Sequence, residues 1–223
     1  ENQTIIGVEV VSKKKKAQLA LMFISEKQDK TVKGQMAYNG KPTREWLSRE
    51  DAASLTAALE SIMITGERDT MTCDIPNAFI QAHLLKRNEG EDRVVMKITG
   101  PLVDMLVKIN AESYGPAVVF ENNKRVLYVE VLRAIYGMLE AAILWYKKFR
   151  KELEGIGFVF NPYDPCIANR TVKGSQHTVV FHMDDLKSTH KLKSVNDEFE
   201  EWLIKMYGSH GKETSTRGKV HDY

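Results

Sequence analysis

The stretch HTVVFHMDDLKSTH, residues 177–190, places two adjacent carboxylates, Asp184 and Asp185, between two apolar and β-branched runs. Such runs predict the two strands of a β-hairpin, with the acidic pair at its tip. Neighbouring like charges repel, so the pair costs stability unless something offsets the repulsion, and a bound cation is the usual candidate. Most acidic pairs in loops are solvated turn residues, but the apolar strand that precedes Asp184 and Asp185 favours a metal-binding site. Because strand residues alternate between faces, we expect His182 to share the face of Asp184.

A metal site for phosphoryl transfer needs carboxylates from at least two segments of the chain. The best second segment is MTCDI, residues 71–75, which predicts a short strand with Asp74 near its end. Mg²⁺ prefers oxygen ligands, so three aspartates and a backbone carbonyl would suffice. Asp74 fits the N-cap of a helix expected at 77–84 equally well, and the pattern leaves both interpretations open.

The composition is that of an ordinary globular protein. Of 223 residues, 43% are hydrophobic and 28% charged, and the formal net charge is only +2, so charge balance alone does not predict nucleic-acid binding. The lysine run at 13–16 is best interpreted as a solvated basic segment. Cys73 and Cys166 form no CxxC motif, which predicts a reduced intracellular protein. No apolar stretch reaches the length of a membrane span, and no secretory signal is visible.

Periodicity and turn residues predict an α+β protein in which an antiparallel sheet is backed by helices on one face. Capping boxes at Ser48 and at Ser194 with Asp197 mark two helix starts. Strands are expected at 5–10, 18–24, 71–75, 93–99, 118–120, 125–131, 167–172 and 177–183, and helices at about 49–64, 77–84, 101–110, 138–155 and 194–208. The abrupt start and end predict a fragment of a longer polyprotein.

Several motifs resemble those of one family in order and spacing. The segment DIPNAF at 74–79 resembles motif A of reverse transcriptases, in the D-x-x-N-A-F form of copia-type LTR retrotransposons. AIYG at 134–137, followed by LWY at 144–146, resembles their A-L-Y-G-L-K-Q-x-P-R-x-W-Y segment. GF at 157–158, DPC at 164–166 and FHMDD at 181–185 resemble the stretch that leads into motif C. The resemblance runs from about residue 33 to the end of the chain.

The resemblance implies a right-hand polymerase fold, with a palm that carries the aspartates, fingers, and a thumb that is absent or truncated. Residues 1–70 would be mainly fingers, and 71–223 mainly palm with a fingers-like insertion at about 86–132. The implied activity is RNA-directed DNA polymerase, a nucleotidyl transfer from deoxynucleoside triphosphates onto a primer 3′-hydroxyl, with two Mg²⁺ ions or Mn²⁺ instead. Implied partners are an RNA or DNA template with its primer and the rest of the pol polyprotein, integrase and ribonuclease H, with no membrane. The implied location is intracellular, in a cytoplasmic particle or the nucleus, and not secreted.

Carried over by position, the resemblance also implies roles for individual residues. Asp74 and Asp184 would bind both metal ions, Asp185 would be the third acid, and Ile75 would offer a backbone carbonyl. Phe79 falls where the family places an aromatic steric gate against ribonucleotides; the alternative is that Phe79 belongs to the core.

Further residues are implied around the substrates. Lys33 and Glu140 would lie near the incoming nucleotide, and His182, Met183 and Gly137 near primer and template. The family's Lys-Gln-x-Pro-Arg stretch is replaced by LEAAI at 139–143, so Glu140 adds a negative charge near a triphosphate or is a surface helix residue. The fingers motif, Lys-Ala-Arg in the family, is KGQ at 33–35, and His182 replaces a tyrosine.

Two other interpretations remain open. A catalytically impaired, nucleic-acid-binding remnant of the same fold is favoured by the altered second motif and by the short link at 64–69, and opposed by the three intact aspartates. A different metal-dependent phosphotransferase would need a phosphate loop or an additional base. The sequence contains neither G-x-x-x-x-G-K-[ST] nor H-E-x-x-H.

Overall fold

The computed structural model describes residues 5–6, 17–26, 30–45, 68–84, 94–208 and 215–217. The chain is an α+β protein that divides into two compact units, each built on one sheet. Unit 1 comprises Glu1–Ala52 with Ala82–Ala141, and unit 2 comprises Ala53–Gln81 with Ala142–Tyr223. None of the helices in the described part of the chain has the length and apolar character needed to cross a membrane.

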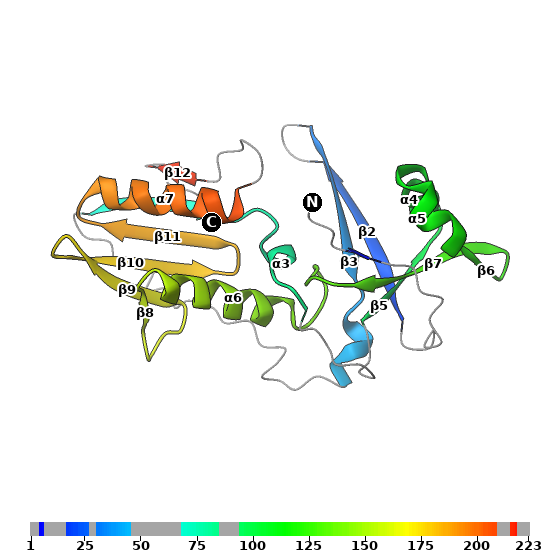
Figure 1. The fold of residues 1–223 in the computed structure, drawn as a ribbon, viewed down its shortest axis with the longest axis horizontal. Helices are drawn as coiled ribbons and strands as arrows, with labels where there is room; N and C mark the ends of the chain where they lie inside the picture. The colour runs from blue at the N-terminus through cyan, green and yellow to red at the C-terminus, as the bar shows by residue number, and fades with distance from the viewer. Residues whose placement is uncertain are drawn as a thin grey trace. The chain divides into compact units, whose positions relative to one another are not determined.

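The sheet of unit 2 is antiparallel throughout, with the strand order β12-β4-β11-β10-β9-β8. Helices α6 (Ala141–Gly155) and α7 (Lys193–Tyr207) lie on one face of it (Figure 1). The strands are β4 (Asp69–Asp74), β8 (Val159–Phe160), β9 (Ile167–Val172), β10 (Ser175–His182), β11 (Asp185–His190) and β12 (Ser215–Arg217). The predicted antiparallel sheet backed by helices on one face is confirmed.

An aromatic layer holds the helices on this sheet. Trp145 and Phe149 are four residues apart on α6, and their rings stack with centroids 5.3 Å apart. Phe149 also meets Phe181 of β10 edge-on at 5.0 Å, and Phe199 of α7 meets the ring of His177 at 5.3 Å. Trp145, Phe149 and Phe199 are each at most 1% exposed, and burying one such side chain contributes about 1.5–3 kcal/mol.

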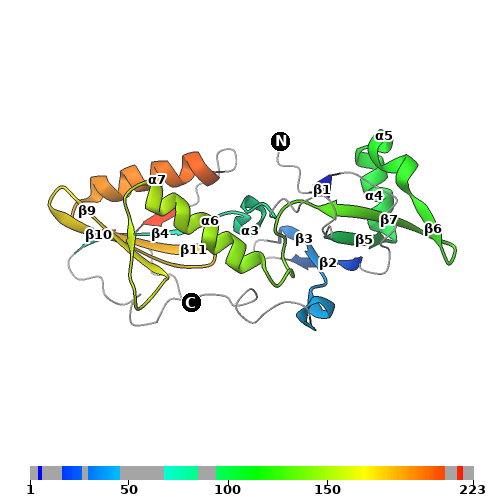
Figure 2. The same ribbon diagram turned by 60° about the horizontal axis from the view of Figure 1, so that its bottom comes forward.

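The sheet of unit 1 is mixed and has the order β1-β7-β5-β2-β3, with β6 also paired to β7 and a parallel pair between β2 and β5. Strands β1 and β6 pair with the two ends of β7 on the side away from β5. The strands of this sheet are β1 (Ile5–Ile6), β2 (Gln18–Glu26), β3 (Val32–Tyr38), β5 (Val95–Thr99), β6 (Val119–Glu121) and β7 (Lys124–Val131). Helix α4 (Pro101–Ile109), with α5 (Ala111–Tyr114) after it, packs beside β5 and β7 (Figure 2). Short 3-10 helices span Lys41–Glu45 and Gly115–Ala117.

Most predicted elements inside the described residues are confirmed, and two helix predictions are corrected. The helix expected at 77–84 is a single turn, α3 (Ala78–Gln81), after which His83 forms a β-bridge with Arg133. The capping box at Ser194 is wrong, because α7 begins one residue earlier and its N-cap, Leu192, makes no side-chain capping bond. The helix at 49–64 with its capping Ser48, the lysine run at 13–16 and residues 7–10 of the first strand lie outside the described residues.

Two glycines allow the backbone at the end of β3 to pack closely against the segment before α6 in unit 1. The Tyr38 N–H donates to the Tyr136 carbonyl at 2.7 Å. Gly137 has φ +89°, and a Cβ there would lie 2.0 Å from the Tyr38 carbonyl oxygen. A Cβ on Gly40 would lie 2.1 Å from the Gly137 carbonyl oxygen. Both positions therefore need glycine for this close backbone approach.

We expect Gly137→Ala to destabilise unit 1 by about 2 kcal/mol, because alanine meets both an unfavourable φ and a backbone collision. Gly174→Ala is the matched control, since Gly174 has φ +74° but nothing within 4 Å of its Cβ position. Urea unfolding and hydrogen exchange of the Tyr38 amide measure the effect. Equal losses in the two variants would contradict the role of the close approach.

Candidate functional site

The acidic pair lies at the tip of a tight hairpin, as predicted. Strands β10 and β11 are joined by the two-residue turn Met183-Asp184, and His182 is the register partner of Asp185. Met183 has φ +55°, in the left-handed region that L-residues other than Gly, Asn and Asp rarely adopt. Asp184 is therefore a turn residue, and Asp185 is the first residue of β11.

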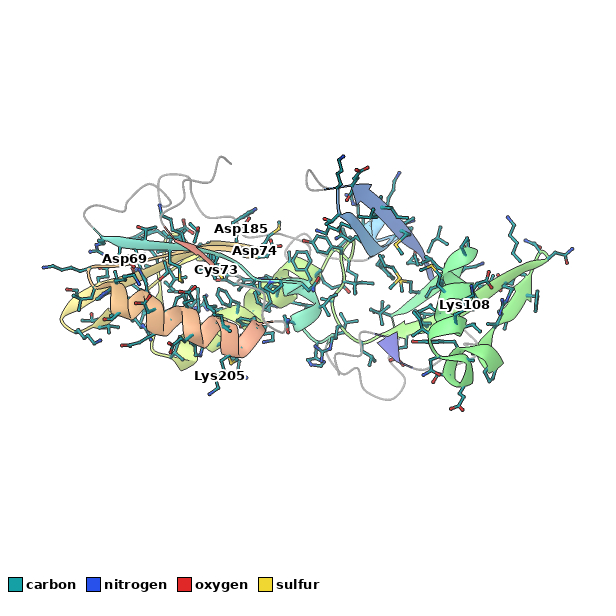
Figure 3. The ribbon with its side chains drawn as sticks, turned by 90° about the horizontal axis from the view of Figure 1, so that it is seen from above. Asp69, Cys73, Asp74, Lys108, Asp185 and Lys205 are labelled. Carbon is teal, nitrogen blue, oxygen red and sulfur yellow. The ribbon has the colours of Figure 1, made fainter. Side chains whose placement is uncertain are left out.

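The third aspartate comes to the same end of the sheet. Strand β4 runs antiparallel to β11, and the register places Asp74 directly opposite Asp185. The Ile75 N–H, one residue after Asp74, donates to the Asp184 carbonyl at 2.9 Å. Figure 3 shows Asp74 and Asp185 next to each other, with Asp69 at the far end of β4. Segments 110 residues apart in the chain thus bring three carboxylates to one sheet edge, Asp74 with the pair Asp184-Asp185.

The alternative role of Asp74 as a helix N-cap does not fit the structure. Asp74 ends β4, and α3 begins only at Ala78, directly after Asn77. Asp74 is exposed at the strand end. Its position serves the pair with Asp185 and not the helix.

The expected face of His182 is wrong. A two-residue turn places the residues on either side of it opposite each other, so His182 shares its face with Asp185. Because Asp185 is also paired with Asp74, the three side chains form a row across β10, β11 and β4. The prediction failed because the alternation of strand residues does not continue through the turn. The Nδ1 atom of His182 is buried and has no hydrogen-bond partner among the described residues.

The row lies on the sheet face opposite α6 and α7. One step further along the same face, Lys187 is the partner of Thr72. Burial lowers the pKa of Lys187. A basic side chain and a threonine hydroxyl therefore lie on the surface that continues from the aspartates, so this surface offers groups for a phosphate as well as for a cation.

The donor set suits a hard divalent cation. Carboxylate and carbonyl oxygens are the ligands that Mg²⁺ prefers. Within the described residues, no three acidic, histidine or cysteine side chains converge into a ready-made metal cage. Mg²⁺ is usually bound through one or two carboxylates and completed by substrate phosphates and water, so it does not need such a cage. The cross-strand pair Asp74 and Asp185, with Asp184 beside it, fits this mode.

Two further residues of the motif A resemblance are buried in unit 2. Ile75 is 2% exposed, and only its backbone is available for a ligand role. Phe79 lies in α3 and is 7% exposed, which is the burial expected for the core alternative. A steric gate would use only the small part of the ring that remains accessible.

The other candidate residues belong to unit 1. Lys33 is exposed on β3 opposite Ser25, and Gln35 pairs with Phe23 on the same strands. Glu140 is partly buried in the turn before α6, and Gly137 has the close contact with Tyr38 described above.

A chain of buried hydrogen bonds that the sequence did not predict lies on the helix-covered face of the sheet, towards the Asp69 end of β4. Arg170 Nε donates to His177 Nδ1 at 3.2 Å, and His177 Nε2 lies 2.7 Å from Ser188 Oγ. Ser188 Oγ donates to Asn196 Oδ1 at 2.8 Å, and Asn196 Nδ2 donates to the Asp69 carboxylate at 2.7 Å. This buried chain, Arg170–His177–Ser188–Asn196–Asp69, links β9, β10, β11, α7 and β4. Polar residues on strand faces that otherwise look apolar were the available signal.

The direction of the buried chain fixes the protonation of His177. Arginine can only donate, so Nδ1 of His177 accepts and Nε2 carries the proton that goes to Ser188. Burial lowers the pKa of His177 to about 3, and the charge of Arg170 adds to this effect. His177, Ser188 and Asn196 are each 0% exposed. No substrate can reach Ser188, so this Ser–His pair stabilises the fold and does not act as a nucleophile with its base.

A second missed contact holds the aspartate turn itself. The Trp145 indole N–H, on α6, donates to the Met183 carbonyl at 2.7 Å. The LWY segment at 144–146 is part of a motif, but no local sequence pattern indicates this contact.

No protein-family model matches the chain, and no curated protein matches it.

Proposed function

We propose that this chain is the reverse transcriptase region of a copia-type retrotransposon polyprotein, an RNA-directed DNA polymerase that extends a primer 3′-hydroxyl. The observation that carries the proposal is the cross-strand pairing of Asp74 with Asp185, next to the turn residue Asp184. Acidic residues from two distant segments meet on one sheet edge, as a two-metal phosphoryl-transfer site requires. In this proposal unit 2 corresponds to the palm, and unit 1 to the fingers with the inserted segment at about 86–132.

Each group of the site has a defined task in the proposed reaction. A pair of divalent cations would supply activation of the primer 3′-hydroxyl and neutralisation of the leaving pyrophosphate. Asp74 and Asp184 would hold both cations, and Asp185, the register partner of Asp74 on β11, would be the third acid. The Ile75 N–H keeps the Asp184 peptide beside β4, so the turn cannot move independently of Asp74.

The surface around the aspartates supports a nucleic-acid partner. Lys187 and the threonines on the same face offer contacts to phosphate oxygens, which position a strand without reading its sequence. Template bases would be selected by pairing with the incoming nucleotide. By the motif resemblance, Lys33 on β3 would contact the phosphates of the incoming nucleotide.

We expect magnesium-dependent extension of oligo(dT) on poly(rA) by the chain, lost in Asp184→Asn. Asp197→Asn is the matched control, because Asp197 is an acid of the same unit that bonds Lys193 on α7. Extension that survives Asp184→Asn at the wild-type rate would contradict the metal assignment.

A catalytically impaired, nucleic-acid-binding remnant is the second candidate. Glu140, where the family has glutamine, favours it, because a carboxylate near a triphosphate repels it. The two candidates differ in the same assay: retained primer–template binding without extension by wild type or by Glu140→Gln would support the remnant. Extension gained by Glu140→Gln would identify this residue as the cause of the impairment.

A further inference from the structure

The Met183-Asp184 turn is held by contacts outside the hairpin. Two other hairpin turns in the described residues include asparagine or glycine: Asn122-Asn123 between β6 and β7, and Lys173, itself at φ +47°, followed by Gly174 between β9 and β10. The aspartate turn instead places a methionine at φ +55°. Methionine has neither the missing Cβ of glycine nor the short polar side chain of asparagine, so the local sequence does not favour this conformation.

Hydrogen bonds from two different elements fix the turn. The Trp145 indole N–H donates to the Met183 carbonyl at 2.7 Å, and the Ile75 N–H donates to the Asp184 carbonyl at 2.9 Å. Both peptide groups of the turn are therefore bonded, one to α6 and one to the residue after Asp74. A buried indole N–H commonly finds some acceptor, so the bond alone would not single out Trp145. Trp145 is singled out because its acceptor is the carbonyl of Met183, the residue with the strained backbone.

The donor itself is rigid. Trp145 is 1% exposed, its ring stacks on Phe149, and it meets Tyr207 of α7 edge-on with centroids 5.4 Å apart. The indole N–H thus has a fixed position relative to both helices. Through it, the helix layer on one face of the sheet determines the peptide orientation at the sheet edge that carries the carboxylates.

We infer that Trp145 is a positioning residue, whose indole N–H holds the Met183-Asp184 turn in the strained conformation that places Asp184 and Asp185 beside Asp74. The use of the turn in metal binding rests on the proposed function, but the conformation of the turn can be measured without any activity. Removing a group that orients metal-binding side chains without touching the metal typically weakens metal affinity by about 10–100-fold.

The test compares four variants of the full chain. Trp145→Phe removes the N–H and keeps an aromatic ring against Phe149. Met183→Gly removes the backbone strain, because glycine adopts positive φ freely. The double variant combines the two changes. Trp202→Phe is the control, since Trp202 stacks on Phe199 of α7 with centroids 5.6 Å apart, while the two turn carbonyls accept from Trp145 and Ile75.

The readouts are the hydrogen-exchange rate of the Ile75 amide and the affinity for Mn²⁺ alone. We expect Trp145→Phe to speed Ile75 exchange at least about tenfold and to weaken Mn²⁺ binding about 10–100-fold. Met183→Gly in the same chain should restore both, because the turn then no longer needs the external bond. Trp202→Phe should leave both unchanged.

Two results would overturn the inference: unchanged Ile75 exchange in Trp145→Phe, or a loss that Met183→Gly does not restore, which would make Trp145 an ordinary core residue. If the exchange rates follow the expected pattern but the wild type neither binds Mn²⁺ nor extends a primer, the positioning of the turn stands and the proposed function fails. The two failures are therefore distinguishable.

Discussion

Replacing Asp74 or Asp185 by asparagine is expected to lower primer extension by about 1,000-fold or more, because under the proposed function each change would remove one ligand of ions that supply several kcal/mol of transition-state stabilisation. The two residues face each other across β4 and β11, so in the proposed site they would act on the same cations. The double variant should therefore be barely worse than either single variant. Such non-additivity is typical of groups that work as a unit.

The same substitutions should stabilise the fold. Two carboxylates in direct cross-strand register repel each other, and relieving one such contact contributes about 0.2–1 kcal/mol. Asparagine keeps the shape of aspartate and removes the charge. Urea unfolding of Asp185→Asn should therefore show equal or greater stability than wild type, while extension is lost. Activity within tenfold of wild type in either single variant would contradict the assignment, and a large loss of stability would mean that the pair is structural.

The sequence was sufficient to predict the hairpin, its acidic tip and the strand that carries Asp74. These features depend on local patterns, namely β-branched runs, a turn and a strand-ending Pro76, whose effects extend over only a few residues. The antiparallel sheet with helices on one face followed from the order of the elements. The strand register that pairs Asp74 with Asp185 was not predicted, because nothing within either segment specifies the other.

The face of His182 could not be derived from strand alternation, because it depends on the length of the turn. A turn of two residues places the flanking residues opposite each other, and a turn with one residue more or fewer would change which carboxylate faces His182. Predicting the face therefore required the conformation of Met183, which its residue type does not favour.

Contacts between segments that are far apart in the sequence could not be predicted either. Trp145 and Met183 are separated by 38 residues, and Asn196 and Asp69 by 127. Asn196 was expected only as a residue of the last helix, and Ser188 only as a residue of the strand after the acidic pair. Their roles arise from the packing of α7 on the sheet, which places polar side chains of three elements in line.

Acidification below pH 6.5 is expected to destabilise unit 2 through His177. Its pKa is lowered by burial to about 3 in the folded chain, against an ordinary value of 6.5. The unfolded chain therefore binds one proton more between these values, and stability falls as the pH drops from 6.5 towards 3. Above pH 6.5 the contribution is fully present. The slope is at most about 1.4 kcal/mol per pH unit, so about 2–3 kcal/mol is lost between pH 6.5 and 4.5.

The physical reason is that His177 cannot accept a proton where it lies. Its Nδ1 accepts from Arg170, so a proton there would face a guanidinium, and the ring is enclosed by Phe158, Phe199 and His190. Urea unfolding across this pH range should show a shallower acid slope in His177→Gln than in wild type. His83→Gln, at an exposed position, should leave the slope unchanged. Identical slopes in wild type and His177→Gln would assign the acid sensitivity to other groups, and would mean that the buried chain Arg170–His177–Ser188–Asn196–Asp69 tolerates a charged histidine.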